Sequence, residues 1–333
     1  MDLEVRHLRM IVTVAETGSV TKAAASLGLA QPALTAQLNR IDRTLGGCVF
    51  TRDRQGARPT ELGELVLRHA RVVLPAMSAL VDDARRLTSE HGTVGRVHVG
   101  TVSSAIGGLF ASRLHTALPG ALGVDDLLVT TATSWSVEET ADRLASGTLD
   151  VALVGMCGDA SPPATGGLVW TAVSTDPVFV LVDEYHPVAG RDAVGLGELA
   201  DALWLTAPGS GCFERCFVGA CARAGFTPRA MGESDRTSCI DQVRGGHAVA
   251  LVQPVLLDAP GVRTVALEGA PLRWTHHVGW RRDAVDRLPV DAVLRAATGA
   301  HRDAVQRSPR YRRWRAEHRW RPRRGEPPHS ARV

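Results

Sequence analysis

The chain has 333 residues, of which 44% are hydrophobic and 22% are charged, with a net charge of +3. This length and composition are ordinary for globular domains with two or three cores. No apolar run approaches the roughly 18–20 residues of a membrane-spanning helix, which argues against a membrane partner. The N-terminus does not resemble a signal peptide, so we expect a cytoplasmic protein whose six cysteines are reduced.

Positive charge is concentrated at the two ends of the chain. Residues 301–333 hold eleven arginines against three acidic residues, and residues 1–60 hold eight basic against five acidic side chains. Residues 91–300 are net acidic. The ends of the chain, but not its body, are therefore suited to approach a polyanion.

The first 60 residues predict three helices followed by a hairpin. Apolar residues recur at helical spacing over residues 5–15, and Gly18 ends this helix. Ser19 is a suitable N-cap for a short second helix, and residues 30–45 form a third amphipathic pattern. Helix, short helix, tight turn and helix is the order of a helix-turn-helix. Residues 46–60 then predict a wing of two short extended segments.

A long helical pattern follows the wing over residues 61–91. Its apolar stripe, which includes Leu65, Val72, Met77 and Leu80, is too extensive for a lone solvated helix. A partner helix, as in a dimer, is the simplest cover. The remaining chain to residue 306 alternates strands and helices, which predicts parallel sheets with helices on both faces and two lobes with a crevice between them.

These segments resemble the LysR-type transcriptional regulators. The resemblance is carried, in order over about residues 3–280, by the sequences ETGSVTKAAASLGLAQPALTAQLNRIDRTLGGCVFTR, RPTELG, GRVHVGT, RLASGTLDVALVG, RAGFTPR and VRGGHAVALVQP. It implies a winged helix-turn-helix over residues 1–60 and a dimerising linker helix over 61–91. It also implies a two-lobed α/β effector-binding domain over 92–306, like the type 2 periplasmic binding proteins, with lobe 1 over about 92–168 and 269–306 and lobe 2 over about 169–268.

The resemblance also implies partners and a function. The function is that of a sequence-specific regulator at the nucleoid, acting as a homotetramer built as a dimer of dimers. The partners are double-stranded promoter DNA, a small-molecule effector between the lobes, and RNA polymerase. We expect no enzymatic activity, because no nucleophile elbow, P-loop or zinc-protease motif is present. A solute-binding protein shares such a crevice, but it would lack the first 90 residues.

The helix at 30–45 has the features of a DNA-reading helix. With Leu34 and Leu38 facing inward, a helical wheel points small and polar residues outward, which lets the helix backbone approach base edges in a major groove. In the family, positions matching Gln31, Pro32 and Thr35 contact DNA. Two departures are Ala30 and Ala36, where the family usually has a serine cap and an arginine. The candidate DNA-binding residues are Ser19, Thr21, Gln31, Pro32, Thr35, Asn39, Arg40, Arg52, Arg54 and Arg58.

The effector crevice is expected at the carboxyl ends of strands, where hydroxyl side chains precede helices. Free N–H groups at a helix N-terminus beside hydroxyls suit a carboxylate or another oxyanion, so an organic anion is a candidate effector, with no further cofactor. Helix capping is the alternative role for each such serine or threonine. The candidate effector-binding residues are Thr101, Ser103, Ser104, Trp135, Ser136, Thr206 and Thr237.

Cysteines and the basic C-terminus leave further alternatives open. Cys212 and Cys221 have a spacing and location similar to the disulfide pair of peroxide-sensing LysR-type regulators, although Gly211 stands where those have a histidine. Buried structural cysteines are the other interpretation, and no metal-ligand spacing is present. Residues 307–333 predict an Arg-rich tail, either disordered or binding DNA phosphates with Tyr311, Trp314 and Trp320 stacking on bases.

Overall fold

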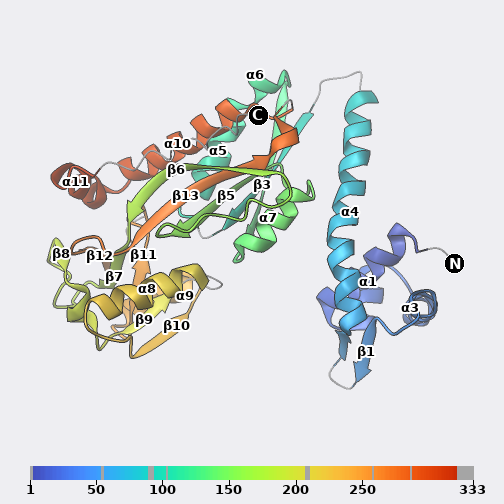
Figure 1. Ribbon diagram of the computed structural model, residues 1–333, viewed down its shortest axis with the longest axis horizontal. Coiled ribbons are helices and arrows are strands. Elements are labelled where there is room, and N and C mark those ends of the chain that lie inside the picture. Colours follow the sequence, from blue (N-terminus) through green and yellow to red (C-terminus); the bar gives the residue numbers. More distant parts are fainter. Residues whose placement is uncertain are drawn as a thin grey trace, which may run out of the picture. The chain divides into compact units, whose positions relative to one another are not determined.

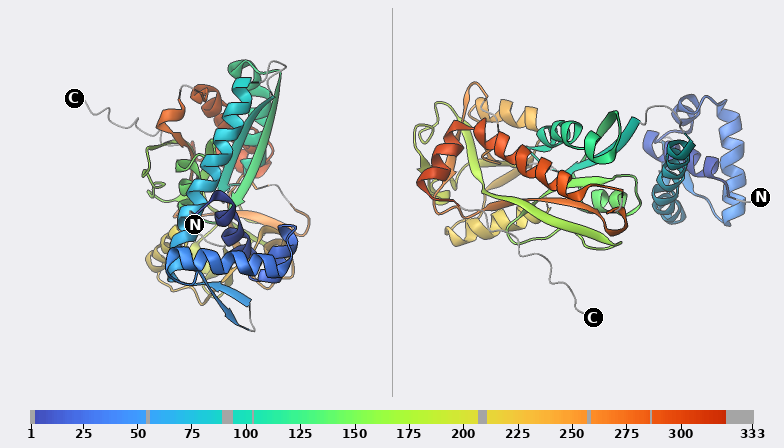
Figure 2. Two further views of the ribbon diagram at one scale, coloured as in Figure 1. Left: turned by 90° about the vertical axis from the view of Figure 1, so that its right-hand side faces the viewer. Right: turned by 90° about the horizontal axis from the view of Figure 1, so that it is seen from above.

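The computed structural model describes residues 3–53, 56–88, 94–102, 104–206, 211–256, 259–285 and 287–320 (Figure 1). The chain divides into two compact units. The first is formed by residues 1–89 and the second by nearly all residues from 90 onward. Figure 2 gives two further views of the elements within each unit.

The first unit is a winged helix-turn-helix, as predicted. Its elements are α1 (Val5–Thr17), α2 (Val20–Ser26), α3 (Gln31–Leu45), β1 (Phe50–Asp53), β2 (Gly56–Pro59) and α4 (Glu61–Thr88). The two strands pair in antiparallel fashion to form the wing. Ile11, Leu34, Leu38 and Ile41 are fully buried between the helices. The apolar spacing of the sequence therefore determines which face of each helix is inside.

Two glycines let backbone segments of this unit approach closely. The N–H of Ala57 donates to the carbonyl of Gly18 at 2.9 Å, and a Cβ on Gly56 would lie 2.4 Å from that carbonyl oxygen. A Cβ on Gly63, in the first turn of α4, would lie 2.1 Å from the carbonyl oxygen of Val49. Glycine at both positions therefore permits the wing to pack against the end of α1 and the start of α4.

Helix α4 leaves an apolar stripe uncovered within its own unit. Thr60 caps its start by accepting a hydrogen bond from the Gly63 N–H at 3.1 Å. Val66 and Leu67 are buried in the first unit. Large apolar side chains continue on the exposed side of the helix, namely Leu65, Val72, Val73, Met77, Leu80 and Val81. This is the stripe for which the sequence predicts a partner helix.

The second unit contains two sheets, one in each lobe. The lobe 1 sheet has the order β4-β3-β5-β13-β6. Its strands are β3 (Val94–Val102), β4 (Asp126–Ser134), β5 (Val151–Cys157), β6 (Leu168–Pro177) and β13 (Arg273–Arg281). Its helices are α5 (Gly107–Ala117), α6 (Pro119–Leu122), α7 (Val137–Ala145), α10 (Val290–Gln306) and α11 (Pro309–Glu317), with the 3-10 turn η2 (Arg282–Ala284).

The lobe 2 sheet has the order β10-β9-β11-β7-β12-β8. Its strands are β7 (Phe179–Asp183), β8 (Ala193–Val194), β9 (Leu203–Thr206), β10 (Ala230–Glu233), β11 (Val249–Val252) and β12 (Val262–Leu267). Helices α8 (Gly211–Arg223) and α9 (Arg236–Arg244) and the 3-10 turn η1 (Leu196–Leu199) complete this lobe. The two-lobed α/β architecture expected from the resemblance is thus present.

Both sheets are mixed, which corrects the prediction of parallel sheets. β13 is antiparallel to β5 and β6, and β7 is antiparallel to β11 and β12. The chain passes from lobe 1 to lobe 2 between β6 and β7 and returns between β12 and β13, so the returning strand enters the lobe 1 sheet in the opposite direction. Because β6 belongs to lobe 1, lobe 2 begins near Phe179 and not at residue 169.

The prediction of an Arg-rich tail over residues 307–333 is wrong for the residues that form α11. Residues 309–317 form α11, and Tyr311 and Trp314 are buried, with 0% and 7% of their surfaces exposed. Trp320 is half-buried and donates from its indole N–H to the carbonyl of Thr175 at 2.9 Å. Buried rings cannot stack on nucleic-acid bases. The aromatic residues between the arginines instead extend the lobe 1 core, and residues 321–333 lie outside the described part of the chain.

Candidate functional site

The outward face of α3 is small and polar, as the helical wheel predicts. Pro32, Ala36, Asn39 and Arg40 are exposed, whereas Leu34, Leu38 and Ile41 on the opposite face are buried. Ala30 has an extended backbone and gives no side-chain cap, so α3 begins without the cap that the family usually has. This face presents little bulk near the helix N-terminus, which suits entry into a major groove.

Gln31 and Thr35 form a polar edge along α3. The Gln31 amide Nε2 donates to the Thr35 hydroxyl at 3.2 Å. This hydrogen bond between residues one turn apart holds the amide at the exposed rim of the helix. The carbonyl and N–H₂ of a glutamine form the donor–acceptor pair that matches an adenine edge. Arg40 lies on the same exposed face of the helix.

The other candidate DNA-binding residues are only partly described. Ser19 accepts a hydrogen bond from the Lys22 N–H at 3.4 Å and therefore caps α2. Thr21 is exposed on α2, and Arg58 is exposed on β2. The Arg52 side chain and all of Arg54 lie outside the described residues.

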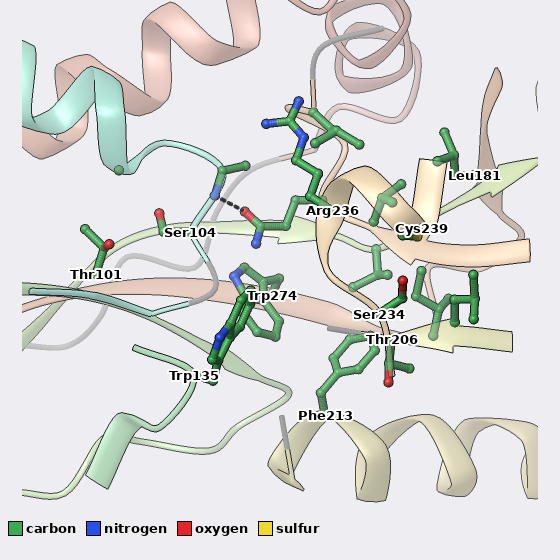
Figure 3. Close-up of a pocket in the computed structure, with 18 of the residues that line it drawn as sticks. Thr101, Ser104, Trp135, Leu181, Thr206, Phe213, Ser234, Arg236, Cys239 and Trp274 are labelled. Carbon is green, nitrogen blue, oxygen red and sulfur yellow. Dashed lines mark hydrogen bonds between the residues drawn. The ribbon is translucent and has the colours of Figure 1, made fainter. Parts of the chain in front are cut away.

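A cavity of about 390 Å³ lies between the two lobes of the second unit (Figure 3). Lobe 1 contributes residues from the ends of β3 and β4 and from the start of α5, and lobe 2 contributes residues from β9, β11, α8 and α9. Trp274 and Val178, at the two crossing segments, complete the wall. Ligand sites in such folds occur at the carboxyl ends of strands, and this cavity has that position.

Four of the predicted effector-binding residues line this cavity: Thr101, Ser104, Trp135 and Thr206. Ser136 is not among the lining residues, and its hydroxyl accepts from the Glu139 N–H at 3.1 Å and so caps α7. Thr237 is exposed and is likewise not among the lining residues. The capping alternative applies to Ser136. Ser103 lies outside the described residues.

Several lining residues are absent from the sequence-based prediction. Arg236 immediately precedes the predicted Thr237. A positive charge at the start of that helix, beside a predicted effector contact, is the sequence feature that could have indicated Arg236. Gln253 follows β11 and crosses to lobe 1, where its side-chain oxygen accepts from the Ala105 N–H at 3.1 Å. No local pattern marks Gln253, whose contact lies in the other lobe, or Trp274, which reaches the cavity through the return of the chain between lobes.

Aromatic rings form one wall of the cavity. Phe213 and Trp274 make an edge-to-face contact, with ring centroids 5.6 Å apart and an interplanar angle of 71°. Trp135 also lines the cavity (Figure 3). Gly155 in β5 makes room for the indole of Trp274, since a Cβ there would lie 2.2 Å from the ring. A glycine on a neighbouring strand thus determines where this wall lies.

The cysteine geometry disfavours a disulfide switch in this conformation. Cys212 and Cys221 both belong to α8, and nine residues of helix separate their backbones by about 13 Å along the axis. A disulfide needs Cα atoms within about 7 Å, so a bond would require α8 to unwind. Cys221 is fully buried, and burial raises the pKa of its thiol to about 11. The side chain of Cys212 lies outside the described residues.

In the part of the chain that the structure describes, no group of three or more His, Cys, Asp or Glu side chains is arranged to hold a metal ion. No described helix is long and apolar enough to cross a membrane.

Each of the two units matches a known protein family. Residues 5–64 match the family "Bacterial regulatory helix-turn-helix protein, lysR family", and residues 90–302 match "LysR substrate binding domain". The small neutral protease regulatory protein of Streptomyces coelicolor is 35% identical over 317 residues, which covers 94% of this chain and 92% of that protein. The HTH-type transcriptional regulator BudR of Raoultella terrigena is 28% identical, covering 84% of this chain and 95% of BudR.

A solved structure shows the same fold. Full-length CbnR in complex with its target DNA superimposes with a TM-score of 0.63 at 23% identity, covering 88% of this chain and 100% of CbnR. The matched segments coincide with the helix-turn-helix unit and with the two-lobed unit that holds the cavity. The chain therefore belongs to the LysR family of DNA-binding transcriptional regulators, with an N-terminal helix-turn-helix and a C-terminal LysR substrate-binding domain.

Proposed function

We propose that this protein, acting in the cytoplasm at the nucleoid, binds promoter DNA as a dimer or a dimer of dimers. Two α3 helices read two half-sites in the major groove, and the wing arginines bind phosphates. A small molecule in the interlobe cavity then changes the affinity for the operator. The observation that carries the proposal is the outward face of α3, small at Pro32 and Ala36 and polar at Gln31 and Thr35. No catalytic step is part of it.

The exposed apolar side chains of α4 support the proposed dimer. A stripe of exposed apolar residues from Leu65 to Val81 has no cover within its own unit, and Leu80 is 61% exposed. A second copy of the same helix would cover it, in the manner of a coiled coil. CbnR, whose structure was solved on its target DNA, has the same fold.

Coupling between ligand and DNA requires two arrangements of the protein. The ligand must bind one arrangement more tightly than the other, because equal affinity for both would leave DNA binding unchanged. The cavity lies between two lobes joined by two crossing segments. A ligand that contacts both lobes would bind more tightly at one angle between the lobes than at another, and so would meet this requirement.

Footprinting tests the DNA-binding part of the proposal. DNase protection on the DNA upstream of the protein's own gene is expected to span several helical turns and to weaken as salt increases. Absence of protection at low salt would contradict the proposal.

The oligomer is tested by charge substitution on α4. Leu80→Glu is expected to shift the protein to monomers in sedimentation experiments and to shorten the footprint to one half-site. Arg71→Glu is the matched control, since a 100° rotation per residue places Arg71 on the opposite side of the helix. Equal effects of the two variants would contradict a dimer formed along the apolar stripe.

A further inference from the structure

Arginine is concentrated in α11 and in the residues that flank it. Six arginines stand in residues 307–319, with Glu317 as the one acidic residue. Residues 91–300 of the same unit are net acidic. Within the described part of the second unit, positive charge therefore gathers at α11, which lies at the outer edge of this unit (Figure 1).

Contacts inside the fold hold α11 in place. Arg310 donates to the carbonyl of Thr264 in lobe 2, and the Arg315 guanidinium lies over the ring of Tyr311, 5.7 Å from its centroid. After the helix, the indole N–H of Trp320 donates to a lobe 1 carbonyl at 2.9 Å. A helix fixed to both lobes presents its other arginines from a rigid backbone, which lowers the entropy lost when they bind a partner.

The outward face of α11 is small and basic. Tyr311 and Trp314 are buried and mark the inward side of the helix. A rotation of 100° per residue places Arg312 and Arg313 on either side of the opposite face, with the exposed Ala316 between them. A small residue between two arginines lets the helix approach a surface closely while both guanidinium groups reach it. Arg319 is exposed just beyond the end of the helix.

The nearby carboxylates balance little of this charge. Asp303 on α10 is bound by Arg113 through two hydrogen bonds of 2.7 and 2.8 Å, and Glu317 is the one carboxylate of α11. Arg312 donates instead to the neutral amide oxygen of Gln306 at 3.4 Å. A phosphate matches a guanidinium in charge and in two-point hydrogen-bond geometry, so phosphate is the partner chemistry that this face favours.

We propose that Arg312, Arg313 and Arg319, termed the basic face, bind the phosphate backbone of duplex DNA as a second contact in addition to α3 and the wing. A duplex bound by the first unit is tethered to the second unit of the same chain, which raises its local concentration. The aromatic rings of α11 are buried and cannot stack on unpaired bases, so a duplex is favoured over a single strand. The contact is therefore independent of base sequence, and it rests on the proposed function only in taking operator-bearing DNA as the partner.

Anisotropy titrations of the full-length protein on a labelled random duplex test the basic face. In the basic-face variant, Arg312, Arg313 and Arg319 are all replaced by glutamine. It is expected to bind about tenfold more weakly than the unsubstituted protein and to lower the slope of log K against log salt by about 2–3 per protomer, since each phosphate contact contributes about 0.9. Unchanged affinity and slope would overturn the proposal.

A matched control removes the same charge from elsewhere on the second unit. It replaces three other exposed arginines by glutamine, namely Arg223, Arg229 and Arg295. This control should keep the affinity and the salt dependence of the unsubstituted protein, because charges farther than a Debye length from the DNA are screened. An equal loss in the control and in the basic-face variant would show that net charge, and not the basic face, determines binding.

Two further measurements separate charge from structure and DNA from protein. Replacing the three residues of the basic face by lysine keeps the charge and should retain most of the salt dependence, whereas a loss as large as with glutamine would contradict a phosphate contact. Poly-glutamate is the probe for an acidic polypeptide as the partner. Loss of poly-glutamate binding in the basic-face variant, with duplex binding unchanged, would contradict DNA as the partner.

Titration on the operator duplex separates this inference from the proposed function. The basic-face variant should lose affinity for operator and random DNA by the same factor, so that the ratio of the two affinities stays the same. An unsubstituted protein that does not prefer its operator, but whose duplex affinity falls in the basic-face variant, contradicts the proposed function and leaves the basic face standing. Operator preference with unchanged affinity in the variant contradicts the basic face alone.

Discussion

The hydroxyl of Tyr311 donates a hydrogen bond to the carboxylate of Asp176, 135 residues earlier in the chain. The Nε2 of His301 lies 2.8 Å from the same carboxylate. Burial by itself raises the pKa of Asp176, but the hydrogen bonds from His301 and Tyr311 lower it below its ordinary value. Asp176 immediately precedes the first crossing segment, so α10 and α11 are both fixed at the junction of the two lobes.

Removing the Tyr311 hydroxyl should therefore destabilise the effector-binding domain. Tyr311→Phe leaves a buried carboxylate with one donor fewer, at a cost of about 1–3 kcal/mol in the free energy of unfolding. Urea unfolding of the full-length protein measures the change. Arg312→Ala, an exposed neighbour on the same helix, should change stability little. Similar stabilities for Tyr311→Phe and the unsubstituted protein would show that this hydrogen bond does not anchor α11.

Stability should also fall in mild acid because of His276. Burial lowers the pKa of this histidine from 6.5 to about 4, although Asp176 nearby opposes the shift and His301 and His277 add to it. Between pH 6.5 and pH 4 the unfolded chain binds more protons at this residue than the folded chain does. The free energy of unfolding is therefore expected to decrease by up to about 3 kcal/mol as pH falls through this window.

The His276→Leu variant checks the source of this pH dependence. Its unfolding free energy should vary less between pH 6.5 and pH 4, whereas the exposed His115→Gln control should follow the unsubstituted protein. The lowered pKa of Asp176 acts in the same direction, but only in stronger acid, where its carboxylate becomes protonated. If the unfolding free energy varied with pH in the same way in all three proteins, His276 would not be the source of the pH dependence.

On DNA, Gln31 should contribute specificity and Arg40 should contribute affinity. Gln31→Ala is expected to lower affinity for the operator by about 1–3 kcal/mol, with little effect on random DNA, because it removes a base contact. Arg40→Ala should weaken both to a similar extent and reduce the salt dependence, as loss of a phosphate contact does. Titration of both variants on cognate and random duplexes decides the matter. Equal losses on both duplexes for the two variants would contradict this division.

Gly155 should control the shape of the ligand cavity. A methyl group at Gly155 would overlap the Trp274 ring, and displacing the ring alters the wall against which the ligand packs. Gly155→Ala is expected to reduce, at least tenfold, the affinity for a ligand that binds in this cavity of the unsubstituted protein. Operator binding in the absence of ligand should be retained. Gly120→Ala, where a Cβ meets no atom within 4 Å, is the control. Unchanged affinity in Gly155→Ala would show that Trp274 adjusts without consequence.

Peroxide should not act as the signal. Cys221 is buried with a thiol pKa raised to about 11, and helix α8 keeps the backbones of Cys212 and Cys221 apart. Operator affinity is expected to be the same with peroxide and with reductant, and Cys212→Ser should retain the response to a bound ligand. A peroxide response that disappears in Cys212→Ser would instead establish the redox alternative.

Local patterns in the sequence predicted the first unit well. Apolar residues three and four positions apart determine the inner faces of α1 and α3, and Ser19 and Gly18 mark the helix boundaries. These features depend on neighbours within one or two turns, so they are visible without a fold. Thr101, Ser104 and Thr206 were also chosen from local pattern, because each lies at or just after the end of a predicted strand, and all three line the cavity.

Tertiary structure alone decided the features that depend on distant parts of the chain. The aromatic residues of α11 stand among arginines and gave no apolar stripe, yet Tyr311 is buried because Asp176 and the lobe 1 core lie beside it. Gln253 of lobe 2 meets Ala105 of lobe 1 at the cavity because two crossings bring the lobes together. Sequence periodicity thus determined which faces of α1 and α3 are buried. Contacts between elements far apart in the chain determined the strand directions, the burial of the aromatic residues of α11, and which side chains line the cavity.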